Sequence, residues 1–170
     1  MEAMSGRHGA GTPAQQGAAA LAGKYLTFTL GTEEYGLPVL KVREIIKVMD
    51  ITQVPQVPEH VRGVINLRGK VIPVIDLRLK FGLPSQEATN RTCIIVVDVA
   101  MVAATVMLGV VVDSVSEVLS VAASEIDQAP EFGGRVVTDY MLGLAKVKGT
   151  VKILLNLDRV LGADREFVAH

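Results

Sequence analysis

Hydrophobic and polar residues alternate strictly over residues 25–30 (YLTFTL), which is the pattern of a β-strand with one buried face. The two leucines and Phe28 share that face. Residues 31–34 (GTEE) are typical of a turn, and the apolar pattern resumes from Tyr35 to Leu37. This part of the chain therefore predicts a β-hairpin that packs on a core through one side.

Residues 39–49 carry two periodicities at once. Val42, Ile46 and Met49 are spaced as on a helix, whereas Val42, Glu44 and Ile46 alternate as on a strand. A second copy of this segment lies 73 positions further on, with residues 36–46 matched by 109–119, and it is equally rich in β-branched residues. We therefore favour extended chain.

An internal repeat also covers the segment that ends each half of the chain. Gly63 and Gly143 lie 80 positions apart, and the same spacing relates four further pairs: Gly69 and Gly149, Val71 and Val151, Leu77 and Leu157, Gly82 and Gly162. The copies share glycines and apolar positions but differ in charge, with Arg68 against Lys148 and Lys70 against Thr150. The repeat therefore preserves a backbone, and we expect the function to lie in the residues that diverge.

Each closing unit predicts a hairpin followed by one helical turn. Gly69 supplies the positive φ that a turn around residues 68–70 needs, and Pro73 predicts an edge strand or a bulge. Asp76 is placed as an N-cap for residues 77–81, and Asn156 repeats it in the second copy. Residues 123–130 predict a short helical turn that stops before the proline.

Residues 94–112 are almost wholly apolar and about as long as a membrane span. The carboxylate of Asp98, Gly109 inside the segment and the dominance of Val and Ile favour two buried strands instead. Residues 99–107 contain no turn-forming residue. They form either a longer hairpin, which we prefer, or an apolar protrusion with its own partner.

Composition narrows the class of protein. The formal net charge of −1 and the 4% aromatic content do not favour a nucleic-acid partner or an aromatic peptide groove. Residues 1–23 are poor in large apolar side chains and predict a disordered tail, and residues 164–170 predict a second tail. Between them we expect one domain, residues 24–163, with sub-barrels of roughly 24–88 and 89–163 whose strands may swap.

No constellation for catalysis is visible. His8, His60 and His170 are scattered without metal-ligand spacing, and Cys93 precedes a run of Ile and Val that predicts a buried thiol. No glycine-rich phosphate-binding loop is present. The sequence predicts neither a cofactor nor a metal.

Two segments, residues 63–69 (GVINLRG) and 71–78 (VIPVIDLR), closely resemble the signature of the chemotaxis coupling proteins of the CheW family. The resemblance continues from about Lys24 to Leu161. Other matching segments are residues 28–31, 34–36, 42–45, 109–115 and 129–132.

This resemblance implies a mostly β fold of two intertwined five-stranded SH3-like barrels that share a hydrophobic core, with short helices. It implies a cytoplasmic, non-enzymatic adaptor that couples transmembrane chemoreceptors to the histidine kinase CheA and is recruited to membrane-associated receptor arrays. Its partners would be the regulatory domain of CheA and the cytoplasmic tip of methyl-accepting receptors. Neither nucleic-acid binding nor direct membrane insertion is implied.

Three residues match positions that the family uses towards receptors, namely Val42, Glu44 and Arg68, and Gly63 is a fourth candidate for the same face. Arg68 at a hairpin tip can present its guanidinium to a carboxylate or a helix end. Glu44 can serve the partner or pair internally with Arg68 or Lys47. Gly63 either admits a close approach or meets a turn requirement.

The kinase-facing residues are expected in two connections, at Val54 and Val57 and at Phe132 and Val137. From the residues alone, two other interpretations stay open. A small-barrel enzyme or ligand carrier would need a deep pocket with convergent polar groups, and a sheet-based nucleic-acid binder would show salt-dependent binding.

Overall fold

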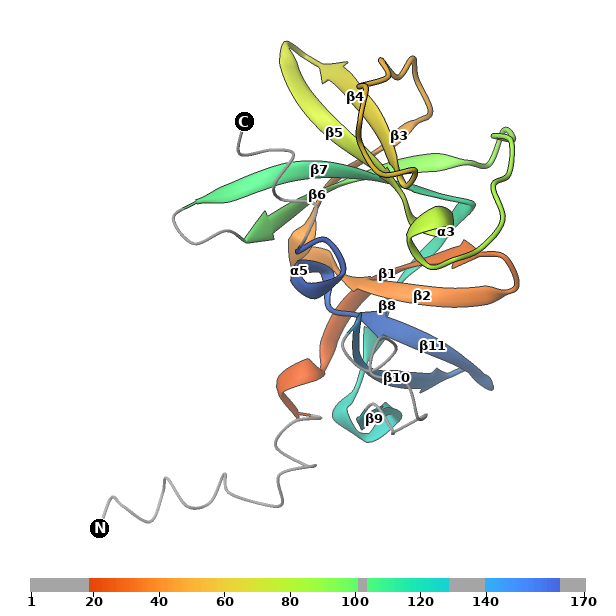
Figure 1. The fold of residues 1–170 in the computed structure, drawn as a ribbon. Coiled ribbons are helices and arrows are strands. Elements are labelled where there is room, and N and C mark those ends of the chain that lie inside the picture. The colour runs from red at the N-terminus through yellow and green to blue at the C-terminus, as the bar shows by residue number, and fades with distance from the viewer. Residues whose placement is uncertain (1–18, 101–103, 129–139, 163–170) are drawn as a thin grey trace.

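The computed structural model describes residues 19–100, 104–128 and 140–162, which form two sheets with short helices between them (Figure 1). The strands of the first half are β1 (Gly23–Leu30), β2 (Glu33–Pro38), β3 (Val42–Lys47), β4 (Val61–Leu67) and β5 (Lys70–Asp76). Those of the second half are β6 (Cys93–Ala100), β7 (Thr105–Val112), β8 (Ser114–Val121), β9 (Ile126–Gln128), β10 (Met141–Val147) and β11 (Thr150–Leu155). The helices are η1 (Val39–Lys41), α3 (Leu77–Lys80), η2 (Ala123–Glu125) and α5 (Leu157–Val160).

The two sheets have the same strand order once the repeat is taken into account. One sheet runs β3-β6-β7-β5-β4 and the other β8-β1-β2-β11-β10-β9. Replacing each strand by its repeat counterpart converts the first order into the first five strands of the second. The predicted pair of small barrels is therefore confirmed, and we call them the five-stranded and six-stranded barrels. The three-residue strand β9, at an edge of the larger one, was not predicted.

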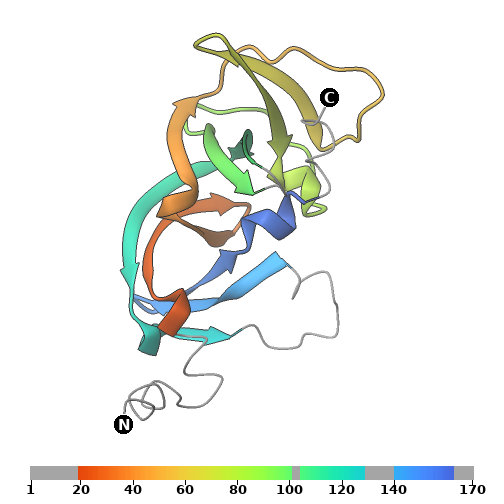
Figure 2. The ribbon, with the colours of Figure 1, turned by 90° about the vertical axis from the view of Figure 1, so that its left-hand side faces the viewer.

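The barrels do not follow the two halves of the chain, because each takes a hairpin from the other half. The hairpin β1–β2 lies in the six-stranded barrel beside β11, and the hairpin β6–β7 lies in the five-stranded barrel beside β5. The chain crosses between barrels at η1 and at Asp113. Figure 2 shows the crossing strands on one side, with β3 rising in orange and β8 descending in teal.

Three apolar clusters hold this arrangement together. The largest lies between the barrels and includes Phe28, Val97 and Leu155, so it draws on both sheets. Two smaller clusters each fill the interior of one barrel. Each fully buried aliphatic or aromatic side chain stabilises the fold by about 1.5–3 kcal/mol. Since the central cluster is shared, neither barrel buries its apolar surface alone.

A row of four aromatic rings extends this central cluster to the surface. The ring centroids of Phe28 and Tyr35 are 5.7 Å apart, those of Tyr35 and Phe81 5.7 Å, and those of Phe81 and Tyr140 5.9 Å. Aromatic pairs at such distances contribute beyond their buried area. Phe81 follows α3, so the row links that helix to the hairpin of the other barrel.

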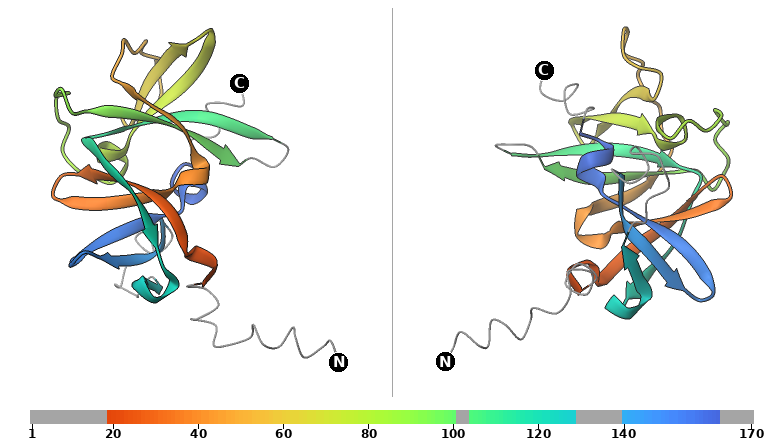
Figure 3. Two further views of the ribbon diagram at one scale, coloured as in Figure 1. Left: turned by 180° about the vertical axis from the view of Figure 1, so that it is seen from behind. Right: turned by 60° about the horizontal axis from the view of Figure 1, so that its bottom comes forward.

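The predicted closing units are confirmed in both halves. The side chain of Asp76 accepts a hydrogen bond from the backbone N–H of Leu79, and Asn156 accepts the equivalent one from Arg159. The helices they cap, α3 and α5, lie between the barrels, as the views from behind and below make plain (Figure 3).

The prediction that Pro73 marks an edge strand is wrong, since β5 lies between β7 and β4. The alternative, a bulge, is found at the neighbouring pairs, where the pairing of β4 with β5 shifts register between Val61 and Gly63. Val64, opposite Pro73, exchanges its backbone hydrogen bonds with Thr52, so the β4 ladder needs no N–H at Pro73. The pairing of β5 with β7 begins only at Val74. The proline therefore costs no ladder hydrogen bond.

Residues 39–47 are extended apart from the single 3-10 turn η1, as predicted. The apolar segment is a long hairpin, paired from Cys93 with Val112 as far as Ala100 with Thr105, and residues 101–103 lie outside the described residues. The prediction for residues 123–130 is correct only for η2, because the chain then pairs with β10 as β9.

Two further expectations need adjustment. Cys93 is the first residue of β6 and is only half-buried. The described chain begins at residue 19, ahead of the expected start at Lys24, and Leu21 packs on the interior of the six-stranded barrel. The carbonyl of Leu21 also accepts a hydrogen bond of 2.6 Å from the Tyr25 hydroxyl.

Two tyrosines, the buried Tyr25 and the half-buried Tyr35, predict how stability depends on alkaline pH. Burial raises the pKa of Tyr25, and burial followed by the negative charge of Glu33 raises the pKa of Tyr35. A raised pKa means that the folded state holds these protons more tightly than the unfolded state. The free energy of unfolding is therefore unaffected well below pH 10 and falls as the pH rises above about 10.

Urea titrations of the wild type and of the double variant Tyr25→Phe, Tyr35→Phe between about pH 8 and pH 11 measure this effect. The double variant should lose less stability over that range. Equal losses in both proteins would contradict the prediction.

Candidate functional site

The first candidate residue, Arg68, lies at the tip of the β4–β5 hairpin. Its backbone φ is +51° and that of Gly69 is +87°. Positive φ at both central residues is the geometry of a type I′ turn, which joins two strands with the correct twist. Asn66 completes the turn by accepting a hydrogen bond of 2.9 Å from the N–H of Gly69. The sequence predicted the glycine but gave no sign that Arg68 also has a positive φ.

Glu44 comes from β3, at the opposite edge of the same sheet. The pairing of β3 with β6 shifts register between Val42 and Glu44, which is a β-bulge. Bulges re-aim side chains at the rims of barrels. The sheet curls until its two edges approach, and Glu44 pairs there with Arg68. Of the two internal partners considered from the sequence, Arg68 is the one observed.

These residues surround a hollow at the rim of the five-stranded barrel. The cavity has a volume of about 480 Å³ and is lined by Val42, Arg43, Glu44, Leu67, Arg68, Lys70 and Met107. Val42 is half-buried and packs on the central cluster, so it belongs partly to the core. Arg68 remains 69% exposed and Glu44 31% exposed despite their ion pair. The hollow thus combines an apolar floor with an accessible cation and anion.

Sequence reasoning found Val42, Glu44 and Arg68, and named Lys70 as a diverging charge, but missed Arg43, Leu67 and Met107. Met107 lies on β7, which belongs to the other half of the chain. Only the strand exchange brings it to this rim, and no local pattern indicates that exchange. Lys70 was visible as a turn charge without any sign of its neighbours.

The second barrel repeats the ion pair and differs from the first at one position of the floor, since Val42 and Leu67 have the apolar counterparts Val115 and Val147. Lys148, in a turn of the same type with φ of +56°, lies 3.4 Å from the carboxylate of Glu117. Lys148 is the repeat counterpart of Arg68, and Glu117 is that of Glu44. At the position of Met107 this barrel carries Glu34, which pairs with the buried Lys152 at 2.6 Å. The expected divergence between the copies therefore lies more in the floor than in the tip charges.

Gly63 is buried in β4, where its pairing with β5 shifts register. Its φ is +140°, and a Cβ at this position would overlap the backbone carbonyl of Thr52. The close approach is therefore made by the protein's own chain. Neither a turn nor an exposed contact surface explains the glycine.

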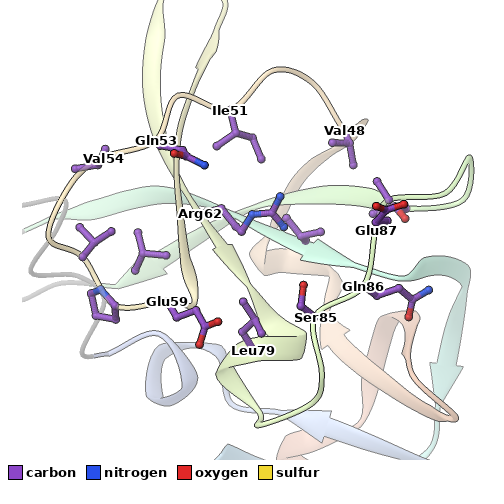
Figure 4. A pocket seen from close by; sticks show the side chains of 16 residues that line it. Val48, Ile51, Gln53, Val54, Glu59, Arg62, Leu79, Ser85, Gln86 and Glu87 are labelled. Atoms are coloured by element: carbon purple, nitrogen blue, oxygen red, sulfur yellow. The ribbon is translucent and has the colours of Figure 1, made fainter.

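A second groove lies between residues 48–60 and the segment that follows α3 (Figure 4). Its volume is about 610 Å³, and its lining includes Val48, Val54 and Val57 together with Ser85, Gln86 and Glu87. Val48 and Val54 are 37% and 38% exposed, whereas Val57 packs on the central cluster. Two of the residues expected to face the kinase thus line one groove.

The other two expected kinase-facing residues, Phe132 and Val137, lie outside the described residues. Among the described residues, no three His, Cys, Asp or Glu side chains are grouped to hold a metal ion. No described helix is long and apolar enough to cross a bilayer. The described sites are surface hollows lined by apolar and charged side chains together, a mixture that suits a protein partner.

Two exchanged SH3-like barrels that carry such hollows form a scaffold suited to binding other proteins. Comparison with known proteins gives the family. A model described as CheW-like domain matches residues 24–165. The chain is 38% identical over 141 residues to the chemotaxis protein CheW of Klebsiella aerogenes, covering 83% of this chain and 82% of the relative. It is 33% identical to the CheW of Helicobacter pylori over 83% of this chain and 82% of that one.

A solved structure agrees with these relatives. The scaffolding protein TtCheW from Thermoanaerobacter tengcongensis superposes with a TM-score of 0.73 at 33% identity, over 83% of this chain and 93% of the other. The chain belongs to the CheW family, whose members are scaffolding adaptors of chemotaxis and not enzymes. This finding replaces the enzyme interpretation that the residues alone had left open.

The geometry at Gly63 predicts a structural role for that residue. Gly63→Ala should lower the free energy of unfolding by at least about 2 kcal/mol, because the new methyl group meets backbone and the φ is unfavourable. Gly149→Ala is the matched control, since its φ of +77° is also strained but nothing lies within 4 Å. Urea unfolding of both variants separates overlap from strain, and equal losses would show that overlap with Thr52 is unimportant.

Proposed function

We propose that this protein couples transmembrane chemoreceptors to the histidine kinase CheA, as a cytoplasmic adaptor recruited to membrane-associated receptor arrays. Membership of a family of chemotaxis scaffolds supports the proposal. The observation that carries it is the rim hollow, because Met107 lies there beside an exposed cation and anion, whereas the other barrel has Glu34 at the matching position. The adaptor needs no cofactor and contacts neither nucleic acid nor the lipid bilayer.

In this proposal the receptor tip docks at the rim of the five-stranded barrel. Met107, Leu67 and Val42 would receive apolar side chains from a helical hairpin. Arg68 would turn from Glu44 to a carboxylate or a helix-end carbonyl of the receptor, for which its planar guanidinium is suited. Losing its present partner costs Arg68 little, since an exposed ion pair contributes only about 0.2–1 kcal/mol. Gly63 would support the site by holding β4 against residue 52.

The regulatory domain of CheA is assigned to the groove between residues 48–60 and residues 85–92. Val54 and Val48 are exposed there, which is typical of an interaction patch when several apolar side chains adjoin. Val57 would act indirectly by fixing the loop on the core. Phe132 and Val137 remain candidates for the same partner. The two hollows share no lining residue, although both reach β4 and β7, and the proposal places one partner in each.

Co-sedimentation with a receptor signalling fragment and CheA tests the function as a whole. Kinase activity in the receptor complex should rise when this protein is added, and the protein should appear in the pellet only when receptor or kinase is present. Absence of both recruitment and activation would refute the adaptor function.

Substituting the tip arginine predicts a selective loss of receptor binding. Arg68→Ala should weaken binding of the receptor fragment by at least about tenfold, because a desolvated charged hydrogen bond is lost. Lys148→Ala removes the equivalent side chain of the other barrel and should change the affinity by no more than about twofold. Titration by fluorescence anisotropy measures both.

Urea unfolding provides the fold control for these variants, and each should change stability by less than about 1 kcal/mol. Glu44→Lys extends the test, because it should repel Arg68 and also weaken receptor binding. Equal receptor affinity of the wild type and Arg68→Ala would show that the receptor does not bind at this rim.

Substituting Val54 predicts a selective loss of kinase binding. Val54→Lys places a charge in the apolar part of the groove and should lower affinity for the CheA regulatory domain by about tenfold, because one apolar contact is replaced by a desolvated ammonium. Val151→Lys is the control, since Val151 is 51% exposed on the other barrel. Calorimetric titration of both variants measures the effect, and receptor affinity should not change in either.

A further inference from the structure

The hairpins β1–β2 and β6–β7 occupy equivalent places in the two barrels, although each belongs to the opposite half of the chain. In the ladders they form, Gly36 lies opposite Leu154 and Gly109 lies opposite Val74. These pairs are repeat counterparts of each other. A Cβ on Gly36 would meet Leu154 at 3.0 Å, whereas one on Gly109 would meet Ile94 of its own hairpin at 2.9 Å and Val74 at an ordinary 3.6 Å. Close packing at the glycines therefore suits either hairpin on either barrel.

One pair of positions in these ladders does distinguish the hairpins. Lys152 of β11 lies opposite Glu34 of β2, and their charged atoms are 2.6 Å apart. The lysine side chain is only 6% exposed and also donates a hydrogen bond of 2.7 Å to Thr150. The repeat counterparts of Lys152 and Glu34 are Ile72 and Met107, which both lie in the apolar cluster of the five-stranded barrel. An ion pair in one barrel thus replaces an apolar pair in the other.

The two crossings between barrels carry a second distinction. After β7, Asp113 pairs with Arg78 of α3 at 2.6 Å, with side chains 20% and 14% exposed. After β2, Lys41 pairs with Asp158 of α5 at 3.0 Å. Arg78 and Asp158 are repeat counterparts with opposite charge. Each helix therefore holds the crossing that carries the complementary sign.

All three ion pairs would be lost if each half kept its own hairpin. Glu34 would face Ile72, and the buried Lys152 would face Met107 without a partner. The first crossing would bring Lys41 towards Arg78, and the second would bring Asp113 towards Asp158. A buried charge without a partner is strongly destabilising, and like charges at close range add to the penalty.

We propose that these three ion pairs select the exchanged topology, because each hairpin meets complementary charges only in the barrel of the other half. The shared apolar core supplies most of the stability. An ion pair with a buried member, such as Lys152 with Glu34, can select among alternatives more than it stabilises, whereas Lys41 and Asp158 are 33% and 36% exposed and add less. The inference is independent of the proposed function, because it concerns only how the chain folds.

Two cysteine pairs in a Cys93→Ser background report which hairpin lies on β11. Glu33→Cys with Val151→Cys reports the exchanged topology, one residue before the Glu34–Lys152 pair. Val106→Cys with Val151→Cys reports the unexchanged one, because Val106 is the repeat counterpart of Glu33. Each full-length chain is unfolded in reducing urea, refolded, and treated with a short bismaleimide. Gel mobility and mass spectrometry then give the cross-linked fraction within and between chains.

The three ion pairs are removed in two steps. Glu34→Met with Lys152→Ile copies the apolar pair that the other barrel already accommodates, so this variant should fold. Adding Arg78→Asp with Asp158→Arg reverses both helix charges. Each step should raise the cross-link between positions 106 and 151 relative to that between 33 and 151, by about tenfold or more for the complete set.

Glu34→Lys with Lys152→Glu is the matched control, because it reverses the pair but keeps it complementary only in the exchanged topology. Its cross-link ratio should equal that of the wild type. An unchanged ratio in the apolar double variant together with an unchanged ratio after helix-charge reversal would overturn the proposal. So would a rise in the matched control equal to that in the apolar variant.

Discussion

The structure depends on the parallel pairing of each incoming hairpin with the closing strand of the other half, β2 on β11 and β7 on β5. Glycine at position 36 lets β2 approach Leu154 of the strand it faces, and glycine at position 109 makes room for Ile94 within its own hairpin. The same pairing directs the apolar side of β1 and β6 into the cluster between the barrels. Barrel interiors, central core and rim all follow from it, because Met107 and Glu34 reach their rims only through this exchange.

Much of the fold could be predicted because it is encoded locally. The alternation at residues 25–30, the turn glycine at 69 and the cap at Asp76 each specify their own segment, and the repeat transfers them to the second half. The local patterns alone could not predict the exchange, since both hairpins fit both barrels by period and register, and only the family resemblance implied intertwined barrels. The strand β9 was missed because three residues give too short a pattern. The family resemblance supplied the architecture that the patterns alone left open.

Prediction of the candidate sites had the same limit. Arg68 and Glu44 stand 24 positions apart, and their meeting depends on a bulge and on the curl of a whole sheet. Their ion pair also has a counterpart in the other barrel, so an ion pair at the hairpin tip is a shared feature of the scaffold. The rims differ at the position beneath this ion pair, which is Met107 in one barrel and Glu34, paired with the buried Lys152, in the other. Charge patterns near the turns could not reveal this, because the deciding residues come from the exchanged strands.

The crossings between barrels have a mechanical consequence. One consists of the short turn η1 and the other of Asp113 alone, and each is held by an ion pair to a helix that packs between the barrels. With so little slack and a common core, the barrels cannot rotate against each other as two linked domains would. The two barrels therefore form one rigid unit. Ligands bound at its separate hollows are held at a fixed spacing and angle, and the fold sets the geometry of any assembly built from it.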